Sequence, residues 1–210
     1  MNKYLYEFIG TFFLVLTIGC TAIFGGDGVI PPLAIGSALM VMIYAGGHLC
    51  GAHYNPAVTL GVFIRGKCAA GDVLPYIIAQ LVGAAAAAFA AKYLFAAKVA
   101  EVALFTPVTG PAMLAEFLFT FALVYVILNV ATAKATAGNS NYGLAIGFTV
   151  LVGAFSVGGI SCGAFNPAVA FALCLYGKIS WSCIWLFLVA EFAAAVVAAL
   201  AFKACNPEDK

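Results

Sequence analysis

The sequence predicts an all-α membrane protein with six transmembrane helices and two re-entrant half-helices, arranged as two inverted three-helix repeats. Three observations predict this fold. The 210 residues are 65% hydrophobic and only 8% charged, whereas a soluble domain carries about 25% charged residues. Six apolar stretches approach the length that crosses a bilayer, and the tripeptide Asn-Pro-Ala occurs twice between them.

The six expected spans are apolar stretches separated by turn-forming residues. A hydrocarbon core about 30 Å thick needs roughly 20 apolar residues in a helix. The stretches that approach this length are residues 4–24, 33–49, 73–93, 111–131, 142–159 and 181–203. The first is expected to be retained as a span and not cleaved. The spans leave no room for a soluble domain, so residues 1–210 are predicted to form a single transmembrane domain.

Two further apolar segments, near residues 55–64 and 166–175, are too short to cross. Each opens with Asn-Pro-Ala, and Asn at the N-cap with Pro at the first helical position marks a helix start. Non-helical backbone at membrane depth is tolerated only where it is buried or lines a watery cavity. The two half-helices therefore predict such a cavity.

An internal repeat relates the two halves of the chain. Residues 33–36 recur as 144–147, and residues 55–58 recur as 166–169, both with an offset of 111. Repeat 1 is expected to cover about 1–105 and repeat 2 about 106–210. Since each repeat holds three spans, an odd number, the second is inverted relative to the first.

Composition and cysteine spacing exclude several classes of protein. The formal net charge is +1, which provides no field for binding nucleic acid. The seven cysteines are odd in number and contain no C-x-x-C pair, so neither a disulfide framework nor a zinc site is expected. We predict no cofactor and no metal.

The positive charges predict an orientation. With six spans, one side carries six cations and the other carries three. The larger group is Lys3, Arg65, Lys67, Lys134, Lys203 and Lys210, and the smaller group is Lys92, Lys98 and Lys178. The positive-inside rule then places both termini in the cytoplasm, and the cell membrane is favoured over an internal one.

Three motifs carry a family resemblance. They are residues 7–11 (EFIGT) in the first span, residues 47–59 (GHLCGAHYNPAVT) after the second, and residues 163–168 (GAFNPA) after the fifth. On these motifs the sequence resembles the aquaporins, or major intrinsic proteins, along nearly its whole length. The resemblance implies a homotetramer in membrane lipid with a pore in each subunit. It also implies that the pore contains both copies of the motif: Asn55, Pro56 and Ala57, with Asn166, Pro167 and Ala168.

The resemblance also identifies four positions that narrow the pore in relatives. Counted from the two motifs, they are Ile35, Ala154, Gly163 and Val169. Similar members characteristically carry Arg at the position of Val169, so this chain is an atypical member without the filter arginine. The set contains no charge and no aromatic ring, which predicts a wider and more apolar filter.

Four polar residues inside the spans are expected to brace the half-helices. Ionisable residues at membrane depth are costly and usually functional. By resemblance, Glu7 and Glu116 accept hydrogen bonds from the irregular backbone that leads into each half-helix. Gln80 and Glu191 are repeat equivalents and are expected to make the same kind of buried bond.

Three residues near the half-helices are candidate gate or thiol sites. His48 and His53 either fix the first loop or act as a pH gate, because imidazole titrates near neutral pH. Cys162, four residues before Asn166, is a candidate site for thiol reagents at the pore mouth.

The sequence thus predicts a passive channel for water and other small neutral solutes, such as glycerol, urea, ammonia, hydrogen peroxide or metalloid hydroxides. The paired half-helices would exclude protons and ions. Two alternatives remain open: a poorly conducting or junctional protein of the same fold, and a coupled transporter, which also uses inverted repeats. An enzyme is not expected, because the sequence contains no nucleophile–base pair.

Overall fold

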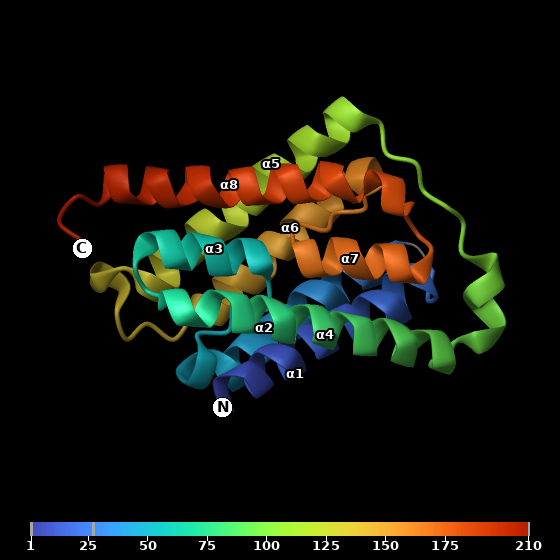
Figure 1. Ribbon diagram of the computed structural model, residues 1–210, viewed down its shortest axis with the longest axis horizontal. Coiled ribbons are helices and arrows are strands. Elements are labelled where there is room, and N and C mark those ends of the chain that lie inside the picture. Colours follow the sequence, from blue (N-terminus) through green and yellow to red (C-terminus); the bar gives the residue numbers. More distant parts are fainter. Residues whose placement is uncertain (1, 27, 210) are drawn as a thin grey trace.

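The computed structural model describes residues 2–26 and 28–209, which form a bundle of six long helices with two short helices between them (Figure 1). All six expected spans are confirmed. They are α1 (Asn2–Ile18) with η1 (Gly19–Ile23), α2 (Ile30–Cys50), α4 (Ala70–Leu94), α5 (Thr109–Ile127) with η3 (Leu128–Thr132), α6 (Tyr142–Ser161), and η5 (Trp181–Cys183) with α8 (Ile184–Cys205). The loops contain two 3₁₀ turns, η2 (Ala96–Glu101) and η4 (Lys134–Thr136).

The two expected half-helices are α3 (Pro56–Arg65) and α7 (Pro167–Tyr176), and they lie end to end in the middle of the bundle (Figure 1). Each begins at the proline of an Asn-Pro-Ala motif. The Asn55 side chain accepts hydrogen bonds from the N–H groups of Ala57 and Val58 in α3, and the Asn166 side chain accepts one from the N–H of Ala168 in α7. These caps satisfy donors that a helix start otherwise leaves unpaired in an apolar region.

The inverted repeat is visible in the element boundaries. The bounds of α3 and α7 differ by 111 residues at both ends, as do those of α4 and the final span, residues 181–205. The π-helical turns η1 and η3 are offset by 109, the offset that also relates Glu7 to Glu116. The repeat therefore preserves a rare backbone geometry as well as sequence motifs.

The long helices approach one another through small residues. Gly36 on α2 and Gly147 on α6 are repeat equivalents, and they meet where these two helices cross. A Cβ added to Gly147 would lie 2.5 Å from the carbonyl oxygen of Gly36. Small side chains on transmembrane helices permit this close approach, and the resulting contacts stabilise the bundle without a hydrophobic driving force from water.

Charged residues at the two ends of the bundle form separate groups. At one end Lys3 Nζ lies 2.7 Å from Asp72, and Arg65 lies 2.7 Å from Asp209. At the other end Lys92 Nζ donates to the Leu175 carbonyl at 2.6 Å. The orientation of these two ends in a membrane stays a prediction, and Lys210 of the larger cationic group lies outside the described residues.

Candidate pore site

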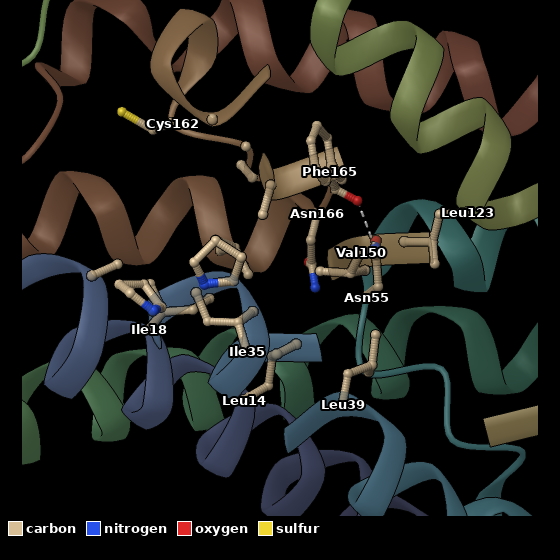
Figure 2. A pocket seen from close by; sticks show the side chains of 18 of the residues that line it. Leu14, Ile18, Ile35, Leu39, Asn55, Leu123, Val150, Cys162, Phe165 and Asn166 are labelled. Atoms are coloured by element: carbon tan, nitrogen blue, oxygen red, sulfur yellow. Dashed lines mark hydrogen bonds between the residues drawn. The ribbon is translucent and has the colours of Figure 1, made fainter. Parts of the chain in front are cut away.

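A cavity of about 380 Å³ runs between the spans and both half-helix loops (Figure 2). Its wall is mainly aliphatic and comes from four spans and the half-helices. The aliphatic side chains include Leu14, Ile18, Leu39, Ile43, Leu123, Ile127, Ile146 and Val150. A wall of this kind cannot hold a polar solute strongly, so orientation within it depends on the few polar groups that face the cavity.

The two motif asparagines form a reciprocal hydrogen-bonded clamp across the repeat. Asn55 Nδ2 donates to the backbone carbonyl of Phe165 at 2.9 Å (Figure 2), and Asn166 Nδ2 donates to the carbonyl of Tyr54, also at 2.9 Å. Both asparagines line the cavity. An amide nitrogen carries two N–H groups, so each asparagine retains one donor that can serve a solute.

The residue before each asparagine has a left-handed backbone. Tyr54 has φ 50° and Phe165 has φ 49°, a conformation that bulky residues rarely adopt. This conformation accompanies the turn that brings each carbonyl to the opposite asparagine. Because such strain persists only where the surroundings enforce it, the neighbouring contacts are part of the site.

In the first repeat, Glu7 enforces this loop conformation. Its Oε1 accepts from the backbone N–H of His53 at 2.8 Å, and its Oε2 accepts from that of Tyr54 at 2.7 Å. Gln80 Nε2 donates to the same Oε2 at 2.8 Å. Glu7 is fully buried, so these bonds replace the water that its carboxylate would otherwise bind.

In the second repeat, Glu116 has the corresponding position. Its Oε1 accepts from the Ser161 hydroxyl at 2.6 Å and from the Ala164 N–H at 3.0 Å, while its Oε2 accepts from the Phe165 N–H at 2.7 Å. The geometry matches the bracing expected for both glutamates.

Gln80 and Glu191 are both buried and both make hydrogen bonds next to the half-helix loops, but with different partners. Gln80 donates to the carboxylate of Glu7, whereas Glu191 Oε1 accepts from the backbone N–H of Asn166 at 3.0 Å. The reason is chemical: an amide has N–H groups to donate and a carboxylate has none. Glu191 Oε2 is buried and no described residue donates to it.

The four predicted filter positions all line this one cavity. Ile35 comes from α2, Ala154 from α6, Gly163 from the loop before α7, and Val169 from the first turn of α7. Val169 is buried, at 4% exposure. All four residues thus line the same cavity, and their role as a filter stays a prediction.

Of the three gate and thiol candidates, two line the cavity and one is not among its described lining residues. His53 lines the cavity, and its Nδ1 lies 3.1 Å from the Thr59 hydroxyl, a contact that fixes the ring. His48 is exposed on the last turn of α2 and is not among the described lining residues. Cys162 lines the cavity and is labelled in Figure 2.

Two features of the site were missed in the sequence. The aromatic residues before each asparagine supply the carbonyls of the clamp, and Lys178 lines the cavity. Both features could have been found from the internal repeat, because each residue has a similar residue at the equivalent position. Tyr54 corresponds to Phe165, and Lys67 corresponds to Lys178, each with the offset of 111.

Comparison with known proteins gives a consistent result. The family model described as "Major intrinsic protein" matches residues 1–202. The chain is 34% identical over 218 residues to the Glycerol uptake facilitator protein-like 6 of Lactiplantibacillus plantarum, covering 100% of both sequences. It is 33% identical to Aquaporin NIP1-4 of Oryza sativa, covering 97% of this chain and 76% of the relative. Among solved structures, the aquaglyceroporin from Plasmodium falciparum has a TM-score of 0.81 and 26% identity, with 95% of this chain and 93% of that chain covered.

Proposed function

The chain belongs to the major intrinsic protein family, a family of membrane channels, and from this premise we propose that it conducts small neutral solutes as well as water. The observation that carries the proposal is the composition of the cavity wall: the four filter positions are Ile35, Ala154, Gly163 and Val169. A constriction without a charged or aromatic side chain is wide and offers few hydrogen bonds, which favours solutes larger than water.

The clamp supports exclusion of protons and ions. The N-termini of α3 and α7 face each other, and each carries roughly half a positive charge from aligned peptide dipoles. A cation at the centre of the pore would be repelled by the partial positive charges of both N-termini. A neutral solute instead accepts hydrogen bonds from the free amide N–H groups of Asn55 and Asn166 and then leaves along an aliphatic wall.

The solute class follows from size and polarity. Glycerol, urea, ammonia, hydrogen peroxide and metalloid hydroxides are neutral and small, and each exchanges hydrogen bonds with paired amides. The names of a glycerol uptake facilitator and an aquaglyceroporin among the similar proteins support this class. We further propose that four chains assemble in the cell membrane with both termini in the cytoplasm.

The test is a stopped-flow series on proteoliposomes that compares water, glycerol and urea. Val169→Arg places a charge at the filter, and Val169→Thr is the matched control because it preserves side-chain size without adding charge. We expect wild type and Val169→Thr to conduct glycerol or urea, and Val169→Arg to reduce that flux at least tenfold while water still passes. Fast water flux without uptake of any neutral solute would refute the proposal.

The same series addresses the alternatives. A junctional protein, or a constriction too apolar to hold water, would show no flux above that of empty liposomes. A coupled transporter would show uptake that depends on an ion gradient, which a passive pore does not.

A further inference from the structure

Lys178 is the charged side chain among the described residues that line the cavity. It lies with Phe105 and Cys162 at one end of the cavity, which we call the outer mouth. The filter positions below it are uncharged, so within the described lining Lys178 supplies the only fixed charge that a solute meets on this route.

The backbone of Lys178 is fixed at the outer mouth. Half-helix α7 ends at Tyr176 and is capped by Gly177, whose φ of 81° is the left-handed conformation that glycine favours. The Lys178 N–H then donates back to the Leu173 carbonyl at 2.9 Å. The Lys178 carbonyl accepts from the Phe105 N–H at 2.7 Å. The backbone from which the side chain extends is therefore fixed beside the pore.

The ammonium group of Lys178 is uncommitted within the described part of the chain. The other two lysines at this end are bound: Lys92 Nζ donates to Leu175 at 2.6 Å and Lys98 Nζ donates to Phe24 at 2.8 Å, both to backbone carbonyls. No described residue accepts a hydrogen bond or forms an ion pair with Lys178 Nζ, so its charge is available to solutes.

The opposite end has a different charge pattern. The repeat equivalent, Lys67, lines a second hollow together with Asp72 and Cys68. Asp72 is itself bound to Lys3 at 2.7 Å. That end therefore carries charges of both signs, whereas the described lining of the outer mouth carries one.

We propose that Lys178 is a charge-selecting residue, which lowers the concentration of cations at the outer mouth and so contributes the selectivity that an uncharged position 169 does not. The proposal rests on the proposed channel function. A cleft with low-dielectric walls focuses the field of a charge on its rim. Within a Debye length of about 8 Å at physiological salt, such a charge changes local ion concentrations, while neutral solutes are unaffected.

The test uses the thiol of Cys162 as a reporter in the outer mouth. The other partly or fully exposed cysteines are replaced by serine: Cys20, Cys68, Cys183 and Cys205. The intact protein in proteoliposomes is then treated with methanethiosulfonates that carry a sulfonate or a trimethylammonium group. The ratio of the two reaction rates reports the local potential, because any change in thiol reactivity affects both reagents equally.

We expect Lys178→Gln to lower the anionic-to-cationic rate ratio about 5-fold at physiological salt, and the difference to disappear in concentrated salt. Two matched controls remove a lysine elsewhere. Lys98 is on the same side of the protein but outside the described lining, and Lys67 is at the opposite end. Neither Lys98→Gln nor Lys67→Gln should change the rate ratio. An unchanged ratio in Lys178→Gln would overturn the proposal.

Two further arms make the result decisive. Asp27 lies outside the described residues but stands between Gly26 and Gly28, which line the cavity, so the comparison is repeated with Asp27→Asn. If Cys162 fails to react, Gly159→Cys places a thiol in the same wall, where an added Cβ meets open space. Failure of both reporters would also overturn the proposal, because the mouth would then be closed to charged solutes.

Failure of this proposal is distinguishable from failure of the channel function. The reagents need only reach the outer mouth, so the rate ratio does not depend on permeation. Water flux measured on the same liposomes reports permeation separately, and a thermal unfolding midpoint of Lys178→Gln near the wild-type value verifies that the variant is folded.

Discussion

The Arg65 guanidinium lies 2.7 Å from the Asp209 carboxylate, so the end of half-helix α3 is joined to the C-terminal tail, residues 206–209. The Arg65 side chain is only 2% exposed and lies over the ring of Phe202, with 4.8 Å from Cζ to the ring centroid. The other Asp209 oxygen accepts from the Lys134 N–H at 2.8 Å. One carboxylate thus holds together α3, the loop after α5, and the tail.

The first prediction is an acid-induced release of this tail. The Lys134 N–H and the Arg65 guanidinium lower the pKa of Asp209 below its ordinary value of 3.8. A carboxylate with a lowered folded-state pKa contributes its full stability above the ordinary value and loses it as the pH falls through the lowered one. A spin label on Glu208→Cys should therefore be immobile from neutral pH to about pH 4 and become mobile below that.

The control for this measurement is Asp209→Asn, which cannot ionise. Its label should be mobile at every pH, without a step. A label that stays immobile in acid, or a step above pH 5, would show that Asp209 does not hold the tail.

The second prediction concerns the crossing of α2 and α6. Gly147→Ala should lower the free energy of unfolding by about 1–3 kcal/mol, because the new methyl group would overlap the Gly36 carbonyl. Gly158→Ala on the same helix is the control, since its Cβ meets no atom within 4 Å and alanine favours the helix. Thermal unfolding in detergent measures both. Equal stability of the two variants would argue against tight packing at this crossing.

The third prediction concerns backbone strain at the outer mouth. Cys162 has φ 71°, a left-handed conformation that is strained for a residue with a Cβ. Its repeat equivalent, Gly51, has φ 81°, and glycine adopts this conformation without strain. Cys162→Gly should raise the free energy of unfolding by about 0.5–1 kcal/mol, after allowance for the greater freedom of glycine in the unfolded chain. Gly51→Ala should lower it by a similar amount. A destabilised Cys162→Gly would mean that thiol packing outweighs the strain.

The fourth prediction separates two buried glutamates. Glu191→Gln keeps an oxygen for the Asn166 N–H and replaces a buried oxygen that no described residue donates to with an uncharged amide nitrogen, so it should change the free energy of unfolding by less than about 1 kcal/mol. Glu116→Gln loses one of the oxygens that accept from Phe165 and Ala164, and should lower it by about 1–3 kcal/mol. The opposite ranking in thermal unfolding would contradict the assigned roles.

Much of the fold was predictable from sequence because the membrane imposes a length. The expected span at 73–93 is observed as Ala70–Leu94, and the half-helix expected near 166–175 is observed as Pro167–Tyr176. The asparagines and the glutamates of the site were found by repetition, since a duplicated chain marks its shared machinery twice.

The remaining features depend on contacts that leave little trace in the residue pattern. The π-helical turns η1 and η3 have no composition that separates them from the α-helices they extend. Aromatic residues do not ordinarily predict left-handed backbone, so the carbonyls of Tyr54 and Phe165 were not expected in the clamp. The bond from Arg65 to Asp209 joins residues 144 positions apart, a pairing that no local pattern encodes.

The asparagine clamp has a consequence for biosynthesis. A ribosome completes Asn55 long before it reaches Phe165, yet the Asn55 amide donates to that later carbonyl. Until residues 165 and 166 emerge, the Asn55 amide lacks its acceptor and the Tyr54 carbonyl lacks its donor. Unsatisfied polar groups of this kind are costly in a hydrocarbon environment. The first repeat can cap α3 and bind its loop to Glu7 by itself, but it cannot complete the clamp before the second repeat is made. Both bonds of the clamp therefore require residues 165 and 166, and a chain truncated before them would leave the Asn55 amide and the Tyr54 carbonyl without these partners.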